Sequence, residues 1–354
     1  MLQSSTPLVS VSMITYNAEK FIGAAIEGVI GQQVDFRIEL VVGDDCSTDH
    51  TRLICESYAA QYPDIIRVLP PGPNLGIAAN TRRTMGSCRG KYIAVCDGDD
   101  IWTDPLKLQR QVDFLESHPG HGIVYTDVET ISESGALVDD EEQEMIRGMY
   151  SSGYVFFKLL QANFINNSTA VFRREWIADH VVYPDRSYQI PDHIRWLHIS
   201  IRGKVQLLAY KSTQYRKHSQ GLSVAVPHSK IVGNRRMFRQ SLYHIIPTFH
   251  RHYTGALNRE EKTLLFRRML SLLFRPPGSL GDRIRILRLL PAYFPGFRGT
   301  VQLAYSKWRK LVLPLTAHKV TLLADFKEYF NQCYATLLTH IHPELSCELI
   351  HLHC

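Results

Sequence analysis

The amino-acid sequence predicts an α/β fold followed by a helical C-terminal extension. Apolar, β-rich segments alternate with amphipathic segments through the first half of the chain, which is typical of βαβ units and of a sheet covered on both faces. Two acidic clusters come directly after predicted strands, where ligands bind in such sheets. From about residue 225 the chain becomes helical and basic, so we expect one domain over 1–225 and an extension over 226–354.

The first part of the chain contains four predicted strands, apolar as buried parallel strands are. Helices with apolar residues at helical spacing separate them. Ser47 and Thr48 are good N-cap residues for the second helix, and Gly90 is expected to end the third. The strands are expected at 8–15, 38–43, 65–69 and 91–96, and the helices at 18–31, from Ser47 onward, and at 77–88.

The alternation continues less regularly to residue 215. The polar, acidic stretch 132–148 is expected to form a mobile loop or lid. A helix is expected to begin near Pro191, because proline is favoured in the first turn of a helix. The other predicted elements are helices at 106–117 and 154–161 and strands at 122–126, 168–173 and within 205–215.

Composition excludes several classes of protein. The chain has 354 residues, of which 45% are hydrophobic and 21% charged, and this balance argues against disorder. No apolar run reaches the ~18 residues that a membrane-spanning helix needs. The N-terminus lacks the basic and apolar blocks of a signal peptide. Seven scattered cysteines indicate reduced thiols, so we expect a cytoplasmic protein.

The net charge of +6 hides a split between the two halves of the chain. Residues 1–150 hold 23 acidic and 11 basic residues, whereas residues 151–354 hold 11 acidic and 29 basic residues. An acidic half can hold a cation, and a basic half can meet phosphates or anionic lipid. The alternative is two solvated surfaces of opposite sign.

The cluster Asp97-Gly98-Asp99-Asp100 follows the fourth predicted strand. Carboxylates two residues apart on such a turn can share Mg²⁺ or Mn²⁺, which take oxygen ligands and complete their shell with substrate phosphates. Gly98 would give the turn its backbone freedom. Taken alone, the tripeptide is also consistent with an ordinary polar turn.

The surrounding stretch GKYIAVCDGDDIWTDPLKLQRQVDFLESHP resembles the family 2 glycosyltransferases. Their pattern here is an apolar strand, Asp-x-Asp-Asp, an aromatic residue and a helix rich in Lys, Leu and Gln. Further features of the family follow in order over residues 8–223. They are VSMITYNAEKFI, VVGDDCSTDHT, NLGIAANTRRT, IPDHIRWLHIS and YRKHSQGLS.

This resemblance implies the GT-A fold, an α/β/α sandwich with a mostly parallel sheet that binds a nucleotide sugar. It implies transfer of the sugar to a hydroxyl group with inversion at the anomeric carbon, assisted by a divalent metal, Mg²⁺ or Mn²⁺. UDP is the expected nucleotide, with dTDP and GDP as alternatives. The acceptor would be a glycan, a glycolipid or a modified protein, as in the synthesis of a cell-surface polysaccharide.

The resemblance also assigns roles to individual residues. Asp99 is the expected metal ligand and Asp97 the contact to ribose or sugar. Asp192 is the candidate general base, although an Asp at this position can also serve as a helix N-cap. The remaining donor contacts are expected at Thr15, Tyr16, Asn17, Asp45 (with Asp44 as the alternative), Asn74, Gly76, Arg82, Arg83, Arg216 and His218.

Trp102 follows the acidic turn and is expected either to stack on the acceptor sugar or to lie in the core. Two other functions are alternatives. A non-catalytic module that binds nucleotide sugars would have no need of Asp192. A phosphotransferase of the haloacid-dehalogenase type would use the first Asp as a nucleophile, but it usually has Thr or Val where this chain has Ile101.

The C-terminal extension is strongly basic. Residues 262–310 hold 11 basic residues and one acid, Asp282, interleaved with Leu and aromatic residues. Peripheral contact with an anionic membrane suits this pattern, and a solvated helical surface or a dimer contact is the alternative. No nucleic-acid recognition motif accompanies it, so no nucleic acid is expected. The His- and Cys-containing tail from His340 to Cys354 fits no closed zinc site.

Overall fold

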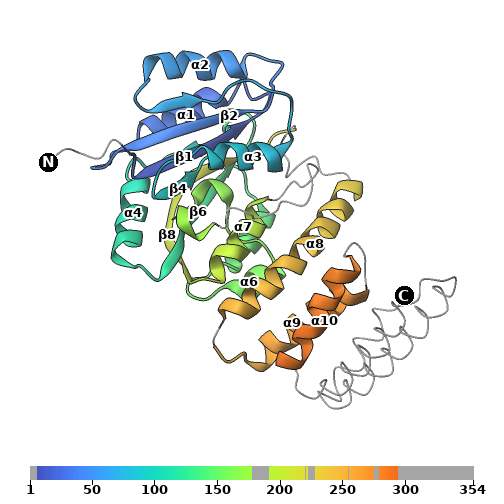
Figure 1. Cartoon of the computed structure of the whole chain (residues 1–354). Helices are drawn as coiled ribbons and strands as arrows, with labels where there is room; N and C mark the ends of the chain where they lie inside the picture. The colour runs from blue at the N-terminus through green and yellow to red at the C-terminus, as the bar shows by residue number, and fades with distance from the viewer. Residues whose placement is uncertain are drawn as a thin grey trace.

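The computed structural model describes residues 6–177, 191–219, 221, 228–253, 255–274 and 279–293. Within these residues an eight-stranded sheet runs in the order β3-β2-β1-β4-β7-β6-β8-β5 (Figure 1). Its first four strands are parallel, and β6 and β8 form a second parallel pair. The strands are β1 (Val9–Thr15), β2 (Ile38–Asp44), β3 (Ile66–Val68), β4 (Tyr92–Val95), β5 (Ile101–Trp102), β6 (His121–Ile131), β7 (Val171–Arg173) and β8 (Lys204–Arg216).

Helices cover both faces of this sheet, which confirms the predicted α/β/α sandwich. Side chains of β2 alternate between the faces, so that Leu40 and Val42 join one buried cluster and Val41 joins the other. The first cluster includes residues of α1 (Ile22–Ile30), α2 (Thr51–Gln61) and α4 (Lys107–Ser117). The second includes residues of α3 (Ile77–Gly86), α6 (Phe156–Gln161) and α7 (Pro191–Ser200).

Three further helices continue the second cluster. They are α8 (His228–His252), α9 (Arg259–Phe274) and α10 (Leu280–Tyr293). Phe249 of α8 stacks on Phe156 of α6 with ring centroids 4.4 Å apart, and Met269 and Ile286 are fully buried in the same cluster. The described part of the predicted helical extension therefore shares its core with the sheet, and the boundary at 225/226 stays a prediction.

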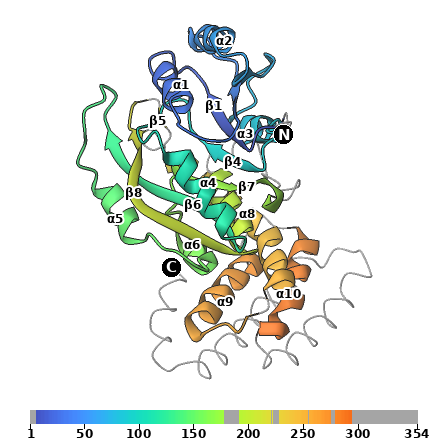
Figure 2. The same ribbon diagram turned by 90° about the vertical axis from the view of Figure 1, so that its left-hand side faces the viewer.

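The stretch 132–148 differs from the expected loop. Residues Glu141–Gly148 form helix α5, which lies beside β6 and β8 (Figure 2). Its N-cap Asp140 accepts a hydrogen bond from the Gln143 amide, and three glutamates in its first turn favour the helix dipole. Lys217 Nζ lies 2.8 Å from Asp140 Oδ2, and Arg147 Nε donates to Asp127 Oδ2. These contacts with neighbouring strands stabilise a helix that charge patterning alone did not reveal.

Smaller differences concern where the elements begin and end. Helix α2 begins at Thr51 with His50 as its N-cap, rather than at Ser47. Helix α1 begins at Ile22, helix α3 ends at Gly86, and 205–215 belong to the single strand β8. The short strand β5, which pairs with β8 at the edge of the sheet, was not expected, because two residues carry no periodicity.

Four cysteines of the described residues are free, and Cys55, Cys88 and Cys96 among them are buried. Burial raises the pKa of the Cys55 and Cys88 thiols to about 12, so these thiols are protonated and inert at neutral pH. Within the described part of the chain, no helix combines the length and the apolar character needed to cross a membrane.

Gly90 offers a test of this packing. A Cβ atom there would lie 2.6 Å from Ser10 N and 2.9 Å from Tyr92 O, and these backbone atoms are fixed by the β1–β4 pairing. We expect Gly90→Ala to lower the free energy of unfolding by about 3 kcal/mol. Gly86→Ala, where a Cβ meets nothing within 4 Å, should change it by less than ~1 kcal/mol. Equal denaturant midpoints for the two variants would contradict this account.

Candidate active site

A cavity of about 1240 Å³ lies where β1, β2, β4 and β8 end, and it extends along α7 to helices α8 and α9. Ligands of open α/β sheets bind at this carboxyl edge. Most of the residues predicted for the site line this one cavity. They are Thr15, Tyr16, Asn17, Asp45, Asp97, Asp99, Asp192, Arg216 and His218.

The loops after β1 and β2 hold one another in place. The Asn17 amide donates to Ser47 Oγ at 3.0 Å, and Asn17 Oδ1 accepts from the Thr48 amide at 2.8 Å. The Ala18 amide donates to Thr51 Oγ1 at 2.7 Å. Asn17 adopts a positive φ of 48°, which Asn tolerates better than most residues. Ser47, Thr48 and Thr51 thus fix the loop that carries Tyr16, whose side chain is 52% exposed.

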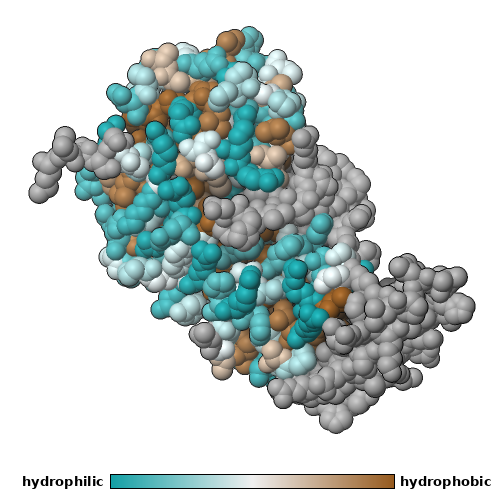
Figure 3. Space-filling model, in the orientation of Figure 1, coloured by the Kyte–Doolittle hydropathy of each residue, from teal (hydrophilic) through white to brown (hydrophobic). Residues whose placement is uncertain are grey.

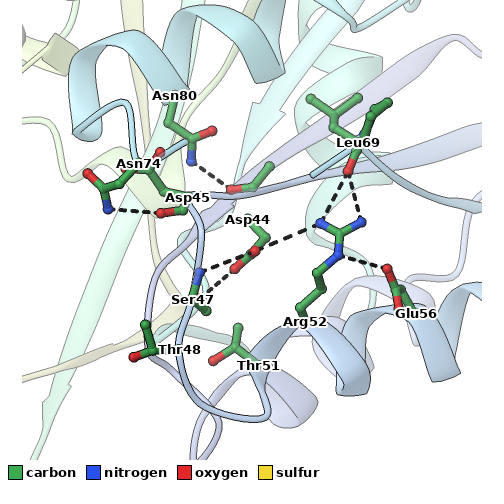
Figure 4. A network of polar contacts seen from close by, with 12 residues as sticks. Asp44, Asp45, Ser47, Thr48, Thr51, Arg52, Glu56, Leu69, Asn74 and Asn80 are labelled. Atoms are coloured by element: carbon green, nitrogen blue, oxygen red, sulfur yellow. Dashed lines mark hydrogen bonds and ion pairs between the residues drawn. The ribbon is translucent and has the colours of Figure 1, made fainter. Parts of the chain in front are cut away.

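Asp44 and Asp45 have different surroundings (Figure 4). Asp44 accepts a hydrogen bond from Ser47 Oγ, lies 3.8 Å from Arg52 Nη1, and does not line the cavity. Asp45 lines the cavity, and its two oxygens accept hydrogen bonds from the Leu75 and Gly76 amides at 2.7 and 2.9 Å. Asp44 thus holds the loop after β2, and Asp45 holds the loop before α3 at the cavity rim. The donor contact at Asp45 stays a prediction.

The segment 74–83 reaches the cavity through residues other than those expected. Asn74 Nδ2 donates to Asp45 O, and Gly76 adopts a φ of 78° at the N-cap of α3. Arg83 Nη2 donates to Asp44 O at 2.9 Å, and Arg82 is exposed outside the cavity. The residues of this helix that line the cavity are Ile77, Asn80 and Thr81, because positions i, i+3 and i+4 share one face.

Three buried side-chain oxygens in this part of the cavity wall have no hydrogen-bond partner among the described residues. They are Thr15 Oγ1, Asn80 Oδ1 and Thr81 Oγ1. A buried polar atom without a partner costs ~1–3 kcal/mol, so their presence together needs an explanation. The sequence analysis missed Asn80 and Thr81, because it favoured the neighbouring arginines as donor contacts.

The acidic turn after β4 is fixed by Asp100. Its carboxylate accepts hydrogen bonds from Ser168 Oγ at 2.5 Å and from the Arg216 amide at 3.0 Å. Burial and the charges of Asp99 and Asp97 raise the pKa of Asp100 well above its ordinary value. Gly98 has no positive φ. A Cβ there would lie 2.8 Å from Thr15 Oγ1, so close approach and not backbone freedom requires glycine.

Asp97 and Asp99 differ in access. Asp97 accepts from Asn167 Nδ2 at both oxygens, at 3.2 and 2.9 Å, and Asn167 Oδ1 in turn accepts from the buried Arg195 at 3.1 Å. Burial and then the charge of Asp99 raise the pKa of Asp97 to about 7. Asp99 has a side chain that is 34% exposed, and Oδ2 lies 3.1 Å from His218 Nε2.

Arg216 and His218 follow β8 and lie against the acidic turn. Arg216 is almost fully buried, and its guanidinium donates to the backbone oxygens of Asp99, Ser132 and Glu133. His218 packs on Phe21 with ring centroids 4.8 Å apart and faces Asp99. Of the two, His218 is the one whose side chain contacts a predicted metal ligand, whereas Arg216 joins the acidic turn to residues 132–133.

Asp192 is in the first turn of α7 and lines the cavity. Its Oδ2 accepts a hydrogen bond from Asn163 Nδ2 at 2.7 Å. Asp192 is close enough to Asp97 to contribute to the raised pKa of that carboxyl. The structure therefore brings the candidate base and the acidic turn to one site, although they are 95 positions apart in the sequence.

Trp102 lies in the core and does not line the cavity. Its side chain is 3% exposed, its Nε1 donates to Ser168 O at 2.7 Å, and Lys107 Nζ lies 4.3 Å above its ring. These contacts support the core alternative over stacking on an acceptor. The His- and Cys-containing tail from His340 to Cys354 lies outside the described residues.

The acidic turn fits a divalent cation that shares its coordination with a substrate. In the described residues, no group of three or more His, Cys, Asp or Glu side chains forms a protein-only metal site. Mg²⁺ is commonly held by one or two carboxylates together with substrate phosphates. Asp99 meets that need, because it is accessible from the cavity, and the crowded charges of Asp97 and Asp99 favour a cation beside them.

The pKa of Asp97 gives a pH-dependent stability. Because the folded-state pKa of about 7 lies above the ordinary 3.8, ionisation costs the folded protein more than the unfolded chain. The stability from this group is fully present below pH ~4 and is lost as the pH rises through 7. One pKa unit corresponds to ~1.4 kcal/mol, so the loss is up to ~4 kcal/mol.

We therefore expect Asp97→Asn to stabilise the metal-free protein at pH 8 and to have a smaller effect at pH 5. Urea unfolding in the presence of a chelator measures both differences. A stabilisation that is the same at the two pH values would show that the pKa of Asp97 is not raised.

Several known proteins are similar to this chain in sequence or in fold. The model of the family described as "Glycosyl transferase family 2" matches residues 10–181. The uncharacterized protein Rv1520 of Mycobacterium tuberculosis is 34% identical over 214 residues, which are 60% of each chain. EpsE of Bacillus subtilis, named as a candidate glycosyltransferase, is 38% identical over 138 residues, 39% of this chain and 46% of EpsE.

Among solved structures, residues 1–349 of S. aureus TarS in complex with UDP-GlcNAc superpose with a TM-score of 0.54. The match covers 83% of this chain and 82% of that TarS fragment at 17% identity, and it shows the fold. This chain spans 60% of the length of the mycobacterial relatives that it matches. The match over residues 10–181 confirms the resemblance of this segment to the family 2 glycosyltransferases, and the fold is the GT-A fold that the sequence predicted.

Proposed function

We propose that this protein is an inverting glycosyltransferase that moves a sugar from a nucleoside diphosphate, with UDP as the first candidate, to a hydroxyl group of a surface glycan or glycolipid. The observation that carries the proposal is the meeting of Asp97, Asp99 and Asp192 in one cavity at the carboxyl edge of the sheet. The family match identifies transfer of sugars rather than phosphoryl groups, so the phosphotransferase alternative loses its support.

The nucleoside would lie at the end of the cavity formed by the loops after β1 and β2. The unpartnered oxygens of Thr15, Asn80 and Thr81 are there, together with the exposed ring of Tyr16. A pyrimidine base and a ribose offer both donors and a flat face to these groups. That TarS is in complex with UDP-GlcNAc and with UDP supports trying UDP before dTDP or GDP.

Asp99 would hold Mg²⁺ or Mn²⁺, with Asp97 directed at the ribose or sugar by Asn167. The metal, when bound, would neutralise the diphosphate as it leaves. The ring of His218, which contacts Asp99, would lie between this carboxylate and the phosphates. When protonated, the ring would add a second positive charge beside the phosphates. Arg82 and Arg83 are not proposed as donor contacts, because the first lies outside the cavity and the second is bound to backbone oxygens.

Asp192 would act as the general base. The acceptor oxygen attacks the anomeric carbon from the side opposite the diphosphate, its proton passes to the Asp192 carboxylate, and the bond to the phosphate oxygen breaks with its electron pair on the leaving UDP. Asn163 orients the carboxylate through the hydrogen bond to Oδ2 and leaves Oδ1 available for the acceptor.

The protein would work in the cytoplasm, where nucleotide sugars are available, either free or in peripheral contact with an anionic membrane. The exposed basic residues on α8, α9 and α10 support such a contact; they include Arg251, Arg259, Lys262, Arg267, Arg285 and Arg288. The face drawn in Figure 3 has hydrophobic residues interspersed among hydrophilic ones, so we expect electrostatic attraction rather than insertion of an apolar surface to dominate.

Nucleotide binding tests the donor site. We expect one nucleoside diphosphate among UDP, dTDP, GDP and ADP to raise the melting temperature only with Mn²⁺, because a ligand that binds only the folded state stabilises it by mass action. Asp99→Ala should abolish that shift. Asp64→Ala, at an exposed position outside the cavity, should preserve it. An undiminished shift for Asp99→Ala would remove the metal assignment.

Turnover tests the base. Asp192→Asn keeps the hydrogen bond to Asn163, so donor binding should stay within twofold of wild type. Loss of a general base typically costs 10²–10⁴-fold in rate, and we expect that loss in UDP release from a UDP-sugar supplied with a cell-envelope glycan extract. Asp64→Asn is the matched control. Near-normal turnover by Asp192→Asn would exclude this residue as the base.

A further inference from the structure

Two arginines line the end of the cavity opposite the β1 and β2 loops. Arg239 of α8 and Arg268 of α9 contribute to the same wall as Asp192. Figure 1 shows α8 and α9 at the other end of the molecule from α2 and β2. Neither arginine lies in the segment that matches the family, which ends at residue 181.

The guanidinium group of Arg268 is partly buried but has few hydrogen-bond partners in the described residues. Its Nη2 donates to Leu160 O at 2.7 Å, and its buried Nε has no hydrogen-bond partner in the described residues. No ion pair joins it to a carboxylate of those residues. Burial and the neighbouring charge of Arg239 lower the pKa of Arg268. Two like charges held together in a partly buried wall favour an anion between them.

This positive wall is next to the turn that carries Asp192. His193 Nε2 donates a hydrogen bond to Leu159 O at 2.6 Å, and its ring stacks on Phe238 of α8 with ring centroids 4.7 Å apart. Burial lowers the pKa of His193, and the charge of Arg268 is close enough to contribute to this lowering. An acceptor whose hydroxyl is at Asp192 would therefore have its neighbouring atoms beside Arg268 and Arg239, while the donor occupies the other end.

We propose that Arg268 and Arg239 bind a phosphate group of the acceptor, so that the hydroxyl that receives the sugar belongs to a phosphate-bearing polyol or glycan. Two guanidinium groups present enough paired N–H donors and enough charge for a phosphate, whereas one would suffice for a carboxylate. The inference rests on the proposed function, because it is Asp192 that defines the acceptor side.

The test uses the full chain saturated with UDP and Mg²⁺, so that the donor site is filled. Glycerol 1-phosphate is the probe, glycerol its neutral counterpart, and calorimetry gives the dissociation constants. Arg267→Gln is the matched control, since Arg267 is the adjacent residue of α9 and is exposed outside the cavity. We expect wild type and Arg267→Gln to bind glycerol 1-phosphate equally, and Arg268→Gln to bind it at least tenfold more weakly.

Equal affinity of Arg268→Gln and Arg267→Gln, or no binding by wild type, would overturn the proposal. If Arg268→Gln fails to fold, Arg239→Gln is judged by the same criterion. Failure of UDP to bind wild type would count against the proposed function. In that case the affinities of Arg268→Gln and Arg267→Gln for glycerol 1-phosphate, measured without UDP, would still decide whether the arginines bind a phosphate. Vesicles of phosphatidylglycerol against phosphatidylcholine distinguish the source: a defect of Arg268→Gln there, relieved by glycerol 1-phosphate, assigns the phosphate to a lipid headgroup.

Discussion

The buried carboxylate of Asp100 is the constraint on which the geometry of the site depends. It receives hydrogen bonds from Ser168 and from the Arg216 amide, so the ends of β4 and β8 and the residues before β7 meet at one side chain. Its neighbours in the turn can then face the cavity. The hydrogen bonds offset the cost of burying an acidic group beside two others. Asp100 therefore fixes the turn that carries Asp97 and Asp99, in addition to lining the cavity itself.

The two ends of the cavity are formed by different kinds of structure. At one end, short loops after parallel strands are cross-linked by Ser47, Thr51 and Asp45, which gives a rigid wall where we propose that the nucleoside lies. At the other end, the segment after α6 supplies Asn163, and α8 and α9 supply two arginines. Helices α8 and α9 share the core with α6 and α7. These basic helices therefore form part of the cavity wall and are not a separate appendage.

The sequence predicted the parallel strands and the acidic turn well, because buried strands are apolar and an Asp-x-Asp after a strand is a local pattern. Prediction from the sequence failed where contacts between residues distant in the chain determine the structure. Helix α5 depends on Lys217 and Asp127, which are distant in sequence. Arg83 was expected to contact the donor, yet it donates to backbone oxygens, while Asn80 and Thr81 line the cavity. Asn167 and Arg268 gave no signal, because only the fold brings them beside Asp97 and Asp192.

A crystal structure with UDP and Mn²⁺ tests the central claim most directly. The account predicts an anomalous manganese peak that bridges Asp99 and the diphosphate, with the uridine against Thr15, Tyr16 and Asn80 and the β-phosphate directed toward Asp192. Manganese bound away from Asp99, or the nucleoside bound at the α8–α9 end of the cavity, would contradict the assignment of donor and acceptor sides.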